Sequence, residues 1–199
     1  MFTIGITGGT GAGKTTALHA LRSLGALTLD CDAIYHDLLV SDEDLKASLG
    51  ARFNGVLRDG EINRKLLGEI VFADRDALLD LNAITHKYIG AAIADKIAAW
   101  VSQGGELVVI DAIALIESGR NKKCDVVVGV TAPKEMRISR IMSRDKITRE
   151  QAEIRINAQK PDNYFIENCD YILEAVYESP EEFEKICIDF FAKIISRRT

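Results

Sequence analysis

The chain lacks several features that would indicate particular classes of protein. It has only four cysteines in 199 residues, widely and irregularly spaced, with no C-x-x-C pair, so a metal site built on thiols is not indicated. It has no surplus of positive charge: the net charge of −5 argues against generic nucleic-acid binding, which usually needs a basic surface. No apolar run approaches the roughly 20 residues of a membrane-spanning helix. We expect four reduced, mostly buried thiols in a soluble protein that binds neither nucleic acid nor membranes.

The overall composition is that of an ordinary globular protein. Hydrophobic residues make up 47% of the chain and charged residues 28%. A chain of 199 residues can bury a sizeable core, and we expect residues 1–199 to form one domain with inserted lobes. The N-terminal residues are typical of a β-strand rather than of a signal peptide, which favours a cytoplasmic location.

The segment from Gly8 to Thr15 is the most informative in the chain. It reads G-G-T-G-A-G-K-T and matches the phosphate-loop pattern G-x-x-x-x-G-K-[ST], between a β-branched run at Phe2–Thr7 and an apparent helix at Thr16–Arg22. Glycines let successive backbone N–H groups face one anion at the positive end of a helix. A glycine-rich turn without a ligand is the alternative, and the flanking strand and helix count against it.

This P-loop predicts binding of a nucleoside triphosphate together with Mg²⁺. Lys14 is expected to reach the β- and γ-phosphates, and Thr15 to offer its hydroxyl to Mg²⁺. The predicted ATP-binding residues form one continuous segment: Gly8, Gly9, Thr10, Gly11, Ala12, Gly13, Lys14, Thr15 and Thr16.

Strand-like and helix-like segments alternate along the chain, which favours a parallel α/β sheet. The stretch from Ala33 to Ser102 interrupts this alternation, because it carries almost no strand signal and has apolar residues at helical spacing. We expect residues 33–102 to form an inserted helical lobe. The further strands are expected at Ala26–Leu29, Leu107–Ile110, Cys124–Val130 and Tyr171–Leu173.

Aspartates follow two of these strands. Ligands bind at the carboxyl ends of the strands in open parallel sheets, so Asp30, Asp32 and Asp111 are expected to face the crevice that holds the P-loop. Phosphoryl transfer needs a group that orients and deprotonates the acceptor, and carboxylates that organise Mg²⁺. Asp32 is the candidate base and Asp111 a candidate near the metal. The alternative for Asp32 and Asp111 is that each only caps the helix after it.

Arginines gather after the predicted strand at Cys124–Val130. Arg137, Arg140 and Arg144 share one face of a helix expected from Pro133 to Met142, which a polar turn follows. A guanidinium over the β- and γ-phosphates would neutralise developing charge, while a mobile lid at residues 143–158 excludes water. Arg140 is therefore a candidate catalytic residue and Arg144 a candidate ATP ligand. A solvated charged face is the alternative.

Several further motifs resemble those of the dephospho-CoA kinase family over nearly the whole chain. The family has T-G-G-I-G-S-G-K-[ST], D-A-D, D-G-x-[IL]-x-R and L-x-x-[IL]-x-H-P. The matching segments here are Thr7–Thr15, Asp30–Asp32, Asp59–Arg64 and Leu81–His86; Arg140, Arg144, Asp145, Thr148, Gln151 and Gln159 fit its lid region.

The resemblance implies a P-loop kinase core of five parallel strands flanked by helices, a helical lobe that binds the CoA part of the substrate, and a small lid. It implies ATP-dependent phosphorylation of the ribose 3′-hydroxyl of dephospho-CoA, the last step of coenzyme A synthesis. Asp32 would be the base, and Arg64, His86 and Leu115 would lie near the substrate. From the residues alone, His86 would be a satisfied, partly buried histidine.

The chain departs from the family's pattern at three places. Ile113 and Ala114 replace a proline and a leucine of D-x-P-L-L-[FV]-E, Lys87 replaces the proline after the histidine, and Ala175 stands where the family has an asparagine near the adenine site. A P-loop kinase for another small alcohol or nucleoside monophosphate is the alternative activity. A nucleotide-dependent switch without transfer activity is more distant, because such a protein needs no base at an acceptor site.

Overall fold

The computed structural model describes residues 1–177 and 179–197, which divide into two compact units. The first unit comprises Met1–Leu29 and Gln103–Thr199, apart from the residues outside the described ranges, and the second comprises Asp30–Ser102. The second unit is thus inserted in the sequence of the first. Each unit has a hydrophobic cluster of its own.

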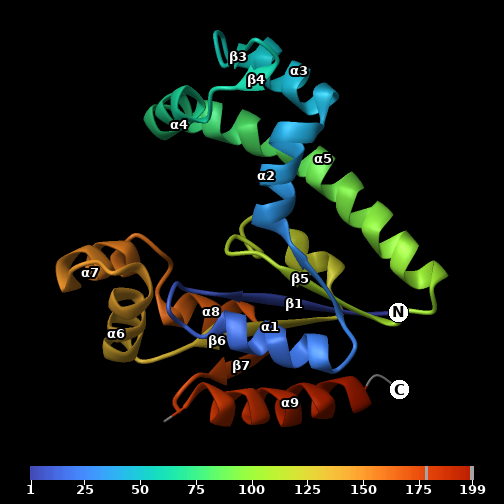
Figure 1. Ribbon diagram of the computed structural model, residues 1–199, viewed down its shortest axis with the longest axis vertical. Helices are drawn as coiled ribbons and strands as arrows, with labels where there is room; N and C mark the ends of the chain where they lie inside the picture. The colour runs from blue at the N-terminus through green and yellow to red at the C-terminus, as the bar shows by residue number, and fades with distance from the viewer. Residues whose placement is uncertain (178, 198–199) are drawn as a thin grey trace. The chain divides into compact units, whose positions relative to one another are not determined.

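A five-stranded sheet forms the centre of the first unit (Figure 1). Strand β1 pairs in parallel with β5 on one side and with β6 on the other, and β6 pairs in parallel with β7. This confirms the predicted α/β fold with a parallel sheet. In spatial order the strands are β2 (Leu27–Asp30), β5 (Leu107–Asp111), β1 (Phe2–Gly8), β6 (Val126–Thr131) and β7 (Tyr171–Glu174).

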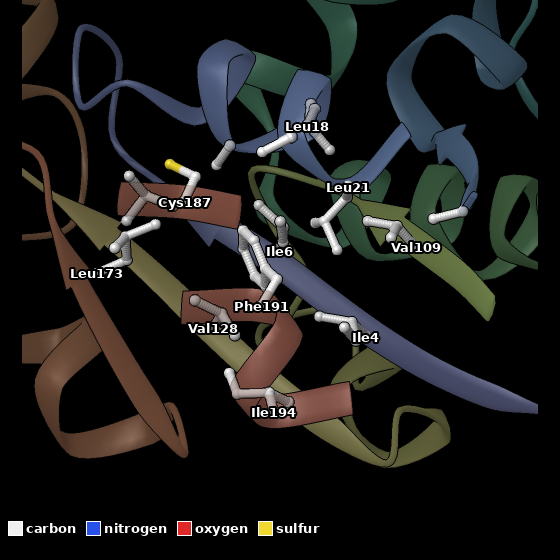
Figure 2. Close-up of a cluster of buried hydrophobic side chains, with 14 of the residues drawn as sticks. Ile4, Ile6, Leu18, Leu21, Val109, Val128, Leu173, Cys187, Phe191 and Ile194 are labelled. Atoms are coloured by element: carbon white, nitrogen blue, oxygen red, sulfur yellow. The ribbon is translucent and has the colours of Figure 1, made fainter. Parts of the chain in front are cut away.

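Helices α1 (Lys14–Ser23) and α9 (Pro180–Ser196) pack against each other and share a core with the sheet. Figure 2 shows Phe191 of α9 among Ile4 and Ile6 of β1 and Val128 of β6. All four side chains are fully buried. Because this core rests on the strand that leads into the P-loop, its packing also fixes where that loop begins.

Two glycines let side chains approach the backbone of β1 and β6 closely. A Cβ on Gly5 would lie 2.7 Å from Leu115 and one on Gly129 would lie 2.9 Å from Ile172, which are distances that real Cβ atoms essentially never show. A Cβ on Gly129 would also lie 3.3 Å from the Cβ of Phe165, in helix α8 (Asp162–Asn168). The close approach at Gly5 lets Leu115 pack, fully buried, in the core of the first unit.

The arginine-bearing helix is longer than the sequence predicted. Helix α6 runs over Lys134–Asp145 and ends at Lys146, whose φ of 54° lies in the left-handed region. Arg144 therefore belongs to the last turn of a helix, and not to a polar turn. Helix α7 (Arg149–Asn157) follows and begins with a capping box of Thr148 and Gln151. The two helices share a small apolar cluster of Ile138, Ile141, Ala152 and Ile156. A 3₁₀ helix, η1 (Arg120–Lys123), precedes β6.

The second unit is helical except for one hairpin that the sequence did not predict. Strands β3 (Leu57–Arg58) and β4 (Glu61–Ile62) pair antiparallel through a turn at Asp59 and Gly60, both with positive φ. A pair of two-residue strands is too short to give a periodic signal. The four helices are α2 (Cys31–Ser41), α3 (Glu43–Arg52), α4 (Arg64–Ala73) and α5 (Arg75–Ser102).

None of the four cysteines forms a disulfide, but only Cys31 and Cys187 are buried, whereas Cys124 and Cys169 are partly exposed, so the prediction of mostly buried thiols holds for two of the four. Burial raises the pKa of Cys187 to about 12 and that of Cys169 to about 11, so both thiols stay protonated at neutral pH. Among the described residues, no helix is long and apolar enough to cross a membrane.

We expect Phe191→Ala to destabilise the protein by about 3–5 kcal/mol, because it removes a large, fully buried side chain and leaves a cavity in the core of the first unit. Urea unfolding followed by circular dichroism measures the change. Phe72→Ala is the matched control, because Phe72 is 89% exposed, and its effect should stay within about 0.5 kcal/mol. Equal losses in the two variants would contradict this description of the core.

Candidate functional site

The predicted P-loop joins β1 to α1. Three of its glycines have positive φ: Gly8 at 148°, Gly11 at 74° and Gly13 at 102°. Gly13 lies directly before the first turn of α1, which carries Lys14, Thr15 and Thr16. Side chains other than glycine rarely adopt such angles, so the glycine spacing specifies the turn that points backbone N–H groups toward one centre.

Lys14 forms an ion pair with Asp111: its Nζ lies 3.0 Å from Oδ1 of the carboxylate. Asp111 ends β5 in register with Ile6 of β1, just before the loop, and the Ala112 N–H donates to the Ile6 carbonyl at 3.2 Å. Parallel strand pairing therefore places the carboxylate beside the lysine. No helix begins directly after Asp111, so the alternative that it caps a helix was wrong.

A cavity of about 640 Å³ opens over the loop. Its wall combines backbone N–H groups and cations with a few apolar groups, which suits a phosphate chain attached to a flat ring. The lining residues are those of the loop from Gly8 to Thr15, with Leu18, Asp111, Ile113, Ser139, Arg140, Ser143, Arg144 and Tyr177.

Arg140 reaches this cavity from α6. Its guanidinium donates to the Gly11 carbonyl at 3.2 Å and to the Ala175 carbonyl at 2.9 Å. The same group lies over the ring of Tyr177, 4.2 Å from its centroid, and Tyr177 stacks on Phe183 at 4.7 Å. Sequence reasoning found the arginine but missed this aromatic support, because the contact joins segments far apart in the chain.

Arg144 also lies at the loop, where its Nη2 is 3.4 Å from the hydroxyl oxygen of Thr10. Its other bonds go to Asp145, at 2.7 Å from Nε and 3.0 Å from Nη2. Asp145 also accepts from Arg155. The Arg144 hydrogen bond is the main cause that holds the pKa of Asp145 below its usual value. Arg144 and Arg155 thus share one carboxylate.

Arg137, on the same helix, is buried and has a role that the sequence did not indicate. Its Nε donates to the Thr10 carbonyl at 3.0 Å and its Nη1 to Asp162 at 3.1 Å. Burial lowers the pKa of this guanidinium, and Asp162 partly offsets that effect. A Cβ on Gly9 would lie 2.2 Å from Nη2. Arg137 therefore packs directly on the loop backbone and needs a glycine there.

A second cavity, of about 420 Å³, adjoins the first, since Gly9 and Ile113 line both. Its wall mixes apolar side chains with a carboxylate, a carboxamide and an ammonium group. The lining residues are Gly9, Ile113, Ala114, Glu117, Ala158, Gln159, Lys160 and Phe165. Leu115 lines neither cavity; it is fully buried against Gly5.

The remaining predicted residues belong to the second unit. Asp30 is the N-cap of α2 and accepts from the N–H groups of Asp32 and Ala33, both at 2.9 Å. The alternative that Asp32 caps this helix was therefore wrong. Arg64, the first residue of α4, has its Nη2 3.5 Å from Nε2 of His36, one turn beyond Asp32 on α2. His86 is half-buried in the middle of α5.

In the described part of the chain, no group of three or more His, Cys, Asp or Glu side chains is placed to hold a metal ion. The oxygen-bearing side chains along the first cavity include the hydroxyl of Thr15 and the carboxylate of Asp111. Mg²⁺ prefers such hard oxygen ligands and commonly takes one or two from the protein and the rest from phosphates and water. The donor set therefore fits Mg²⁺ carried by a nucleotide.

We expect Gly9→Ala to reduce ATP affinity at least about tenfold, because the added Cβ would displace the Arg137 guanidinium and with it the loop. Isothermal titration calorimetry with a non-hydrolysable ATP analogue measures this. Gly90→Ala, in α5 where nothing lies within 4 Å of the new Cβ, is the control and should leave affinity unchanged. An unchanged affinity in Gly9→Ala would show that the loop tolerates movement of Arg137.

Known proteins match the chain over most of its length. The family model described as dephospho-CoA kinase matches residues 2–181. The dephospho-CoA kinase of Dehalococcoides mccartyi is 41% identical over 162 residues, which cover 80% of this chain and 81% of that protein. The one of Geobacter sulfurreducens is 34% identical and covers 96% of this chain and 97% of its own.

The fold is also similar to that of a solved structure. A crystal structure of a Thermus thermophilus protein superposes with a TM-score of 0.81 at 27% identity, covering 100% of this chain and 98% of that one. The family match and the identities together establish the relationship, and the cavities described above lie within the matched residues. The chain therefore belongs to the dephospho-CoA kinase family.

Proposed function

We propose that the chain transfers the γ-phosphoryl group of ATP to the ribose 3′-hydroxyl of dephospho-CoA, giving coenzyme A and ADP. Family membership supports the reaction class. The observation that carries the proposal is the pair of adjoining cavities, one over the P-loop and one beside it, which share Gly9 and Ile113. Two substrates that meet at one phosphoryl group need two such neighbouring spaces.

The first cavity is the proposed ATP site. The backbone N–H groups from Gly8 to Thr15 would hold the phosphates, with Lys14 on the β- and γ-phosphates. Lys14 would then exchange part of its bond to Asp111 for phosphate oxygens. Arg144, already at Thr10, lies within the wall of the same cavity. Arg140 would add positive charge over the phosphates once a nucleotide competes for its bonds.

Thr15 and Asp111 are the residues proposed to hold Mg²⁺, directly or through water. When bound, Mg²⁺ would neutralise charge on the phosphate oxygens. Asp111 holds Lys14 in place before the nucleotide binds. The same carboxylate would thus order both cations of the site.

The second cavity is the proposed site for the nucleoside part of the acceptor. Ile113, Ala114 and Phe165 offer apolar surface for a flat base, and Glu117, Gln159 and Lys160 offer hydrogen bonds at its edge. Ile113 and Ala114 are two of the departures from the family's pattern, so they would set how this chain holds its acceptor. Leu115 would not contact the acceptor; its packing against Gly5 would fix the turn that carries Ile113 and Ala114.

The second unit would supply the base and further acceptor contacts. Asp32 belongs to the first turn of α2, and Asp30 already satisfies the end of that helix, so Asp32 is not needed as a cap. We assign Asp32 to accept the proton of the 3′-hydroxyl while the new O–P bond forms and the bond to the ADP oxygen breaks. Arg64 carries a positive charge beside His36, one turn along the same helix, and would attract the acceptor's diphosphate. His86 is proposed to line the same acceptor region.

The deciding experiment supplies the purified protein with ATP and Mg²⁺ and one acceptor at a time: dephospho-CoA, adenosine, AMP, CMP or shikimate. Mass spectrometry should show gain of one phosphate on dephospho-CoA. Lys14→Ala is the negative control and should lose at least about 10²-fold in kcat/KM. Phosphorylation of another acceptor and not of dephospho-CoA would replace this proposal with a kinase of different specificity. ATP binding with no acceptor phosphorylated would favour a nucleotide-dependent switch.

We expect Asp32→Asn to lower kcat by roughly 10²- to 10⁴-fold, the usual contribution of acid–base catalysis, because it removes the basic carboxylate at nearly constant shape. Calorimetry should show unchanged binding of ATP with Mg²⁺. Asp30→Asn is the control: asparagine also caps helices, so the variant should keep most of its activity. A collapse of ATP affinity in Asp32→Asn would instead assign Asp32 to the metal.

A further inference from the structure

The backbone of Thr10 in the P-loop is held through both its N–H and its carbonyl by side chains from outside the loop. Its N–H donates to Oε1 of Gln159 at 2.7 Å, and its carbonyl accepts from Nε of Arg137 at 3.0 Å. Arg137 also donates from Nη2 to the same Gln159 oxygen at 3.3 Å. These three bonds form a small closed network around the backbone of one loop residue, Thr10.

The network is anchored by Arg137, whose side chain is shielded from water. Arg137 is 3% exposed, and its Nη1 donates to Asp162 at 3.1 Å. A buried guanidinium that loses its hydrogen-bond partners leaves an uncompensated charge, which is costly. The network therefore favours the arrangement in which Arg137 keeps its bonds to Thr10, Gln159 and Asp162. The position of Thr10 therefore depends on the side chain of Gln159 as well as on the glycines.

Gln159 also faces the second cavity, as part of its wall. Because both of its partners are donors, the oxygen of its carboxamide must point to the loop, and the Nε2 group forms the other edge. In the described ranges, 1–177 and 179–197, that Nε2 group has no hydrogen-bond partner in the protein. Two N–H donors are thus left for an occupant of the cavity.

We infer that Gln159 is a positioning residue that links the second cavity to the P-loop. An acceptor whose base or ribose accepts a bond from Nε2 fixes the carboxamide and strengthens the two bonds at Oε1, because chains of hydrogen bonds polarise one another. The Thr10 segment is then held in place when the acceptor is present. This inference deepens the proposed function and rests on it for the identity of the occupant.

Two substitutions distinguish the role of the Gln159 carboxamide oxygen from that of its NH₂ group. Gln159→Glu keeps oxygens for Thr10 and Arg137 and removes the Nε2 donors, so it should hold the loop without responding to the acceptor. Gln159→Leu removes both edges. Asn168→Leu makes the same chemical change on an exposed residue of α8, whose amide bonds only within its own helix, and is the control.

Calorimetry measures the affinity for a non-hydrolysable ATP analogue with Mg²⁺, in the absence and the presence of saturating dephospho-CoA. We expect dephospho-CoA to raise this affinity about fivefold or more in the unmodified protein and in Asn168→Leu. Both Gln159 variants should lose this enhancement. Without acceptor, Gln159→Glu should bind the analogue as the unmodified protein does, whereas Gln159→Leu should bind it more weakly and show a kcat about 10- to 100-fold lower.

Retention of the enhancement by Gln159→Leu, or its absence from the unmodified protein, would overturn the link. Equal nucleotide affinity in Gln159→Leu and the unmodified protein would overturn the positioning role, and this comparison needs no acceptor. Thermal unfolding of each variant checks that the fold is kept. If dephospho-CoA is neither bound nor phosphorylated by the unmodified protein, the proposed function fails by itself, and the acceptor-free comparison still decides whether Gln159 positions the loop.

Discussion

The ion pair between Lys14 and Asp111 is the interaction on which the site depends. A lysine at the start of α1 stands at the positive end of the helix, where a cation is unfavourable without a counter-charge. The carboxylate that supplies this counter-charge is that of Asp111, at the end of β5, which pairs in register with β1. Its Oδ1 lies 3.0 Å from Nζ of Lys14. The order of strands in the sheet is thus what keeps the lysine extended toward the place where phosphates would lie.

The parts of the fold that depend on short sequence patterns could be predicted. The glycine spacing of the P-loop and the apolar strands both report local structure, and the structure contains each of them. The hairpin at Leu57–Ile62 was missed because its strands are too short for a periodic signal. The end of α6 was placed too early, because its last turn is polar and only Lys146, with its positive φ, marks where it stops.

The P-loop of the candidate site could be predicted from the sequence, whereas the contacts of the side chains around it could not. Arg137 lies 127 residues from Thr10 along the chain, and no local pattern distinguishes its buried guanidinium from that of the half-exposed Arg140. Asp30 and Asp32 are both suitable helix caps by type, and only the hydrogen bonds assign the role to Asp30. The stacking of Tyr177 on Phe183 likewise needs the tertiary fold. In each case the contacts of the folded chain, and not the residue type, decide which of several similar side chains takes the structural role.

The buried thiol of Cys187 has a practical consequence. Thiol reagents and oxidants react with the thiolate, which is scarce when the pKa is about 12 and is also enclosed by the core that Figure 2 shows. Alkylation at this position therefore requires that α9 separate from the sheet. The rate at which a thiol reagent labels Cys187 therefore reports how often the core of the first unit opens under native conditions, without denaturant.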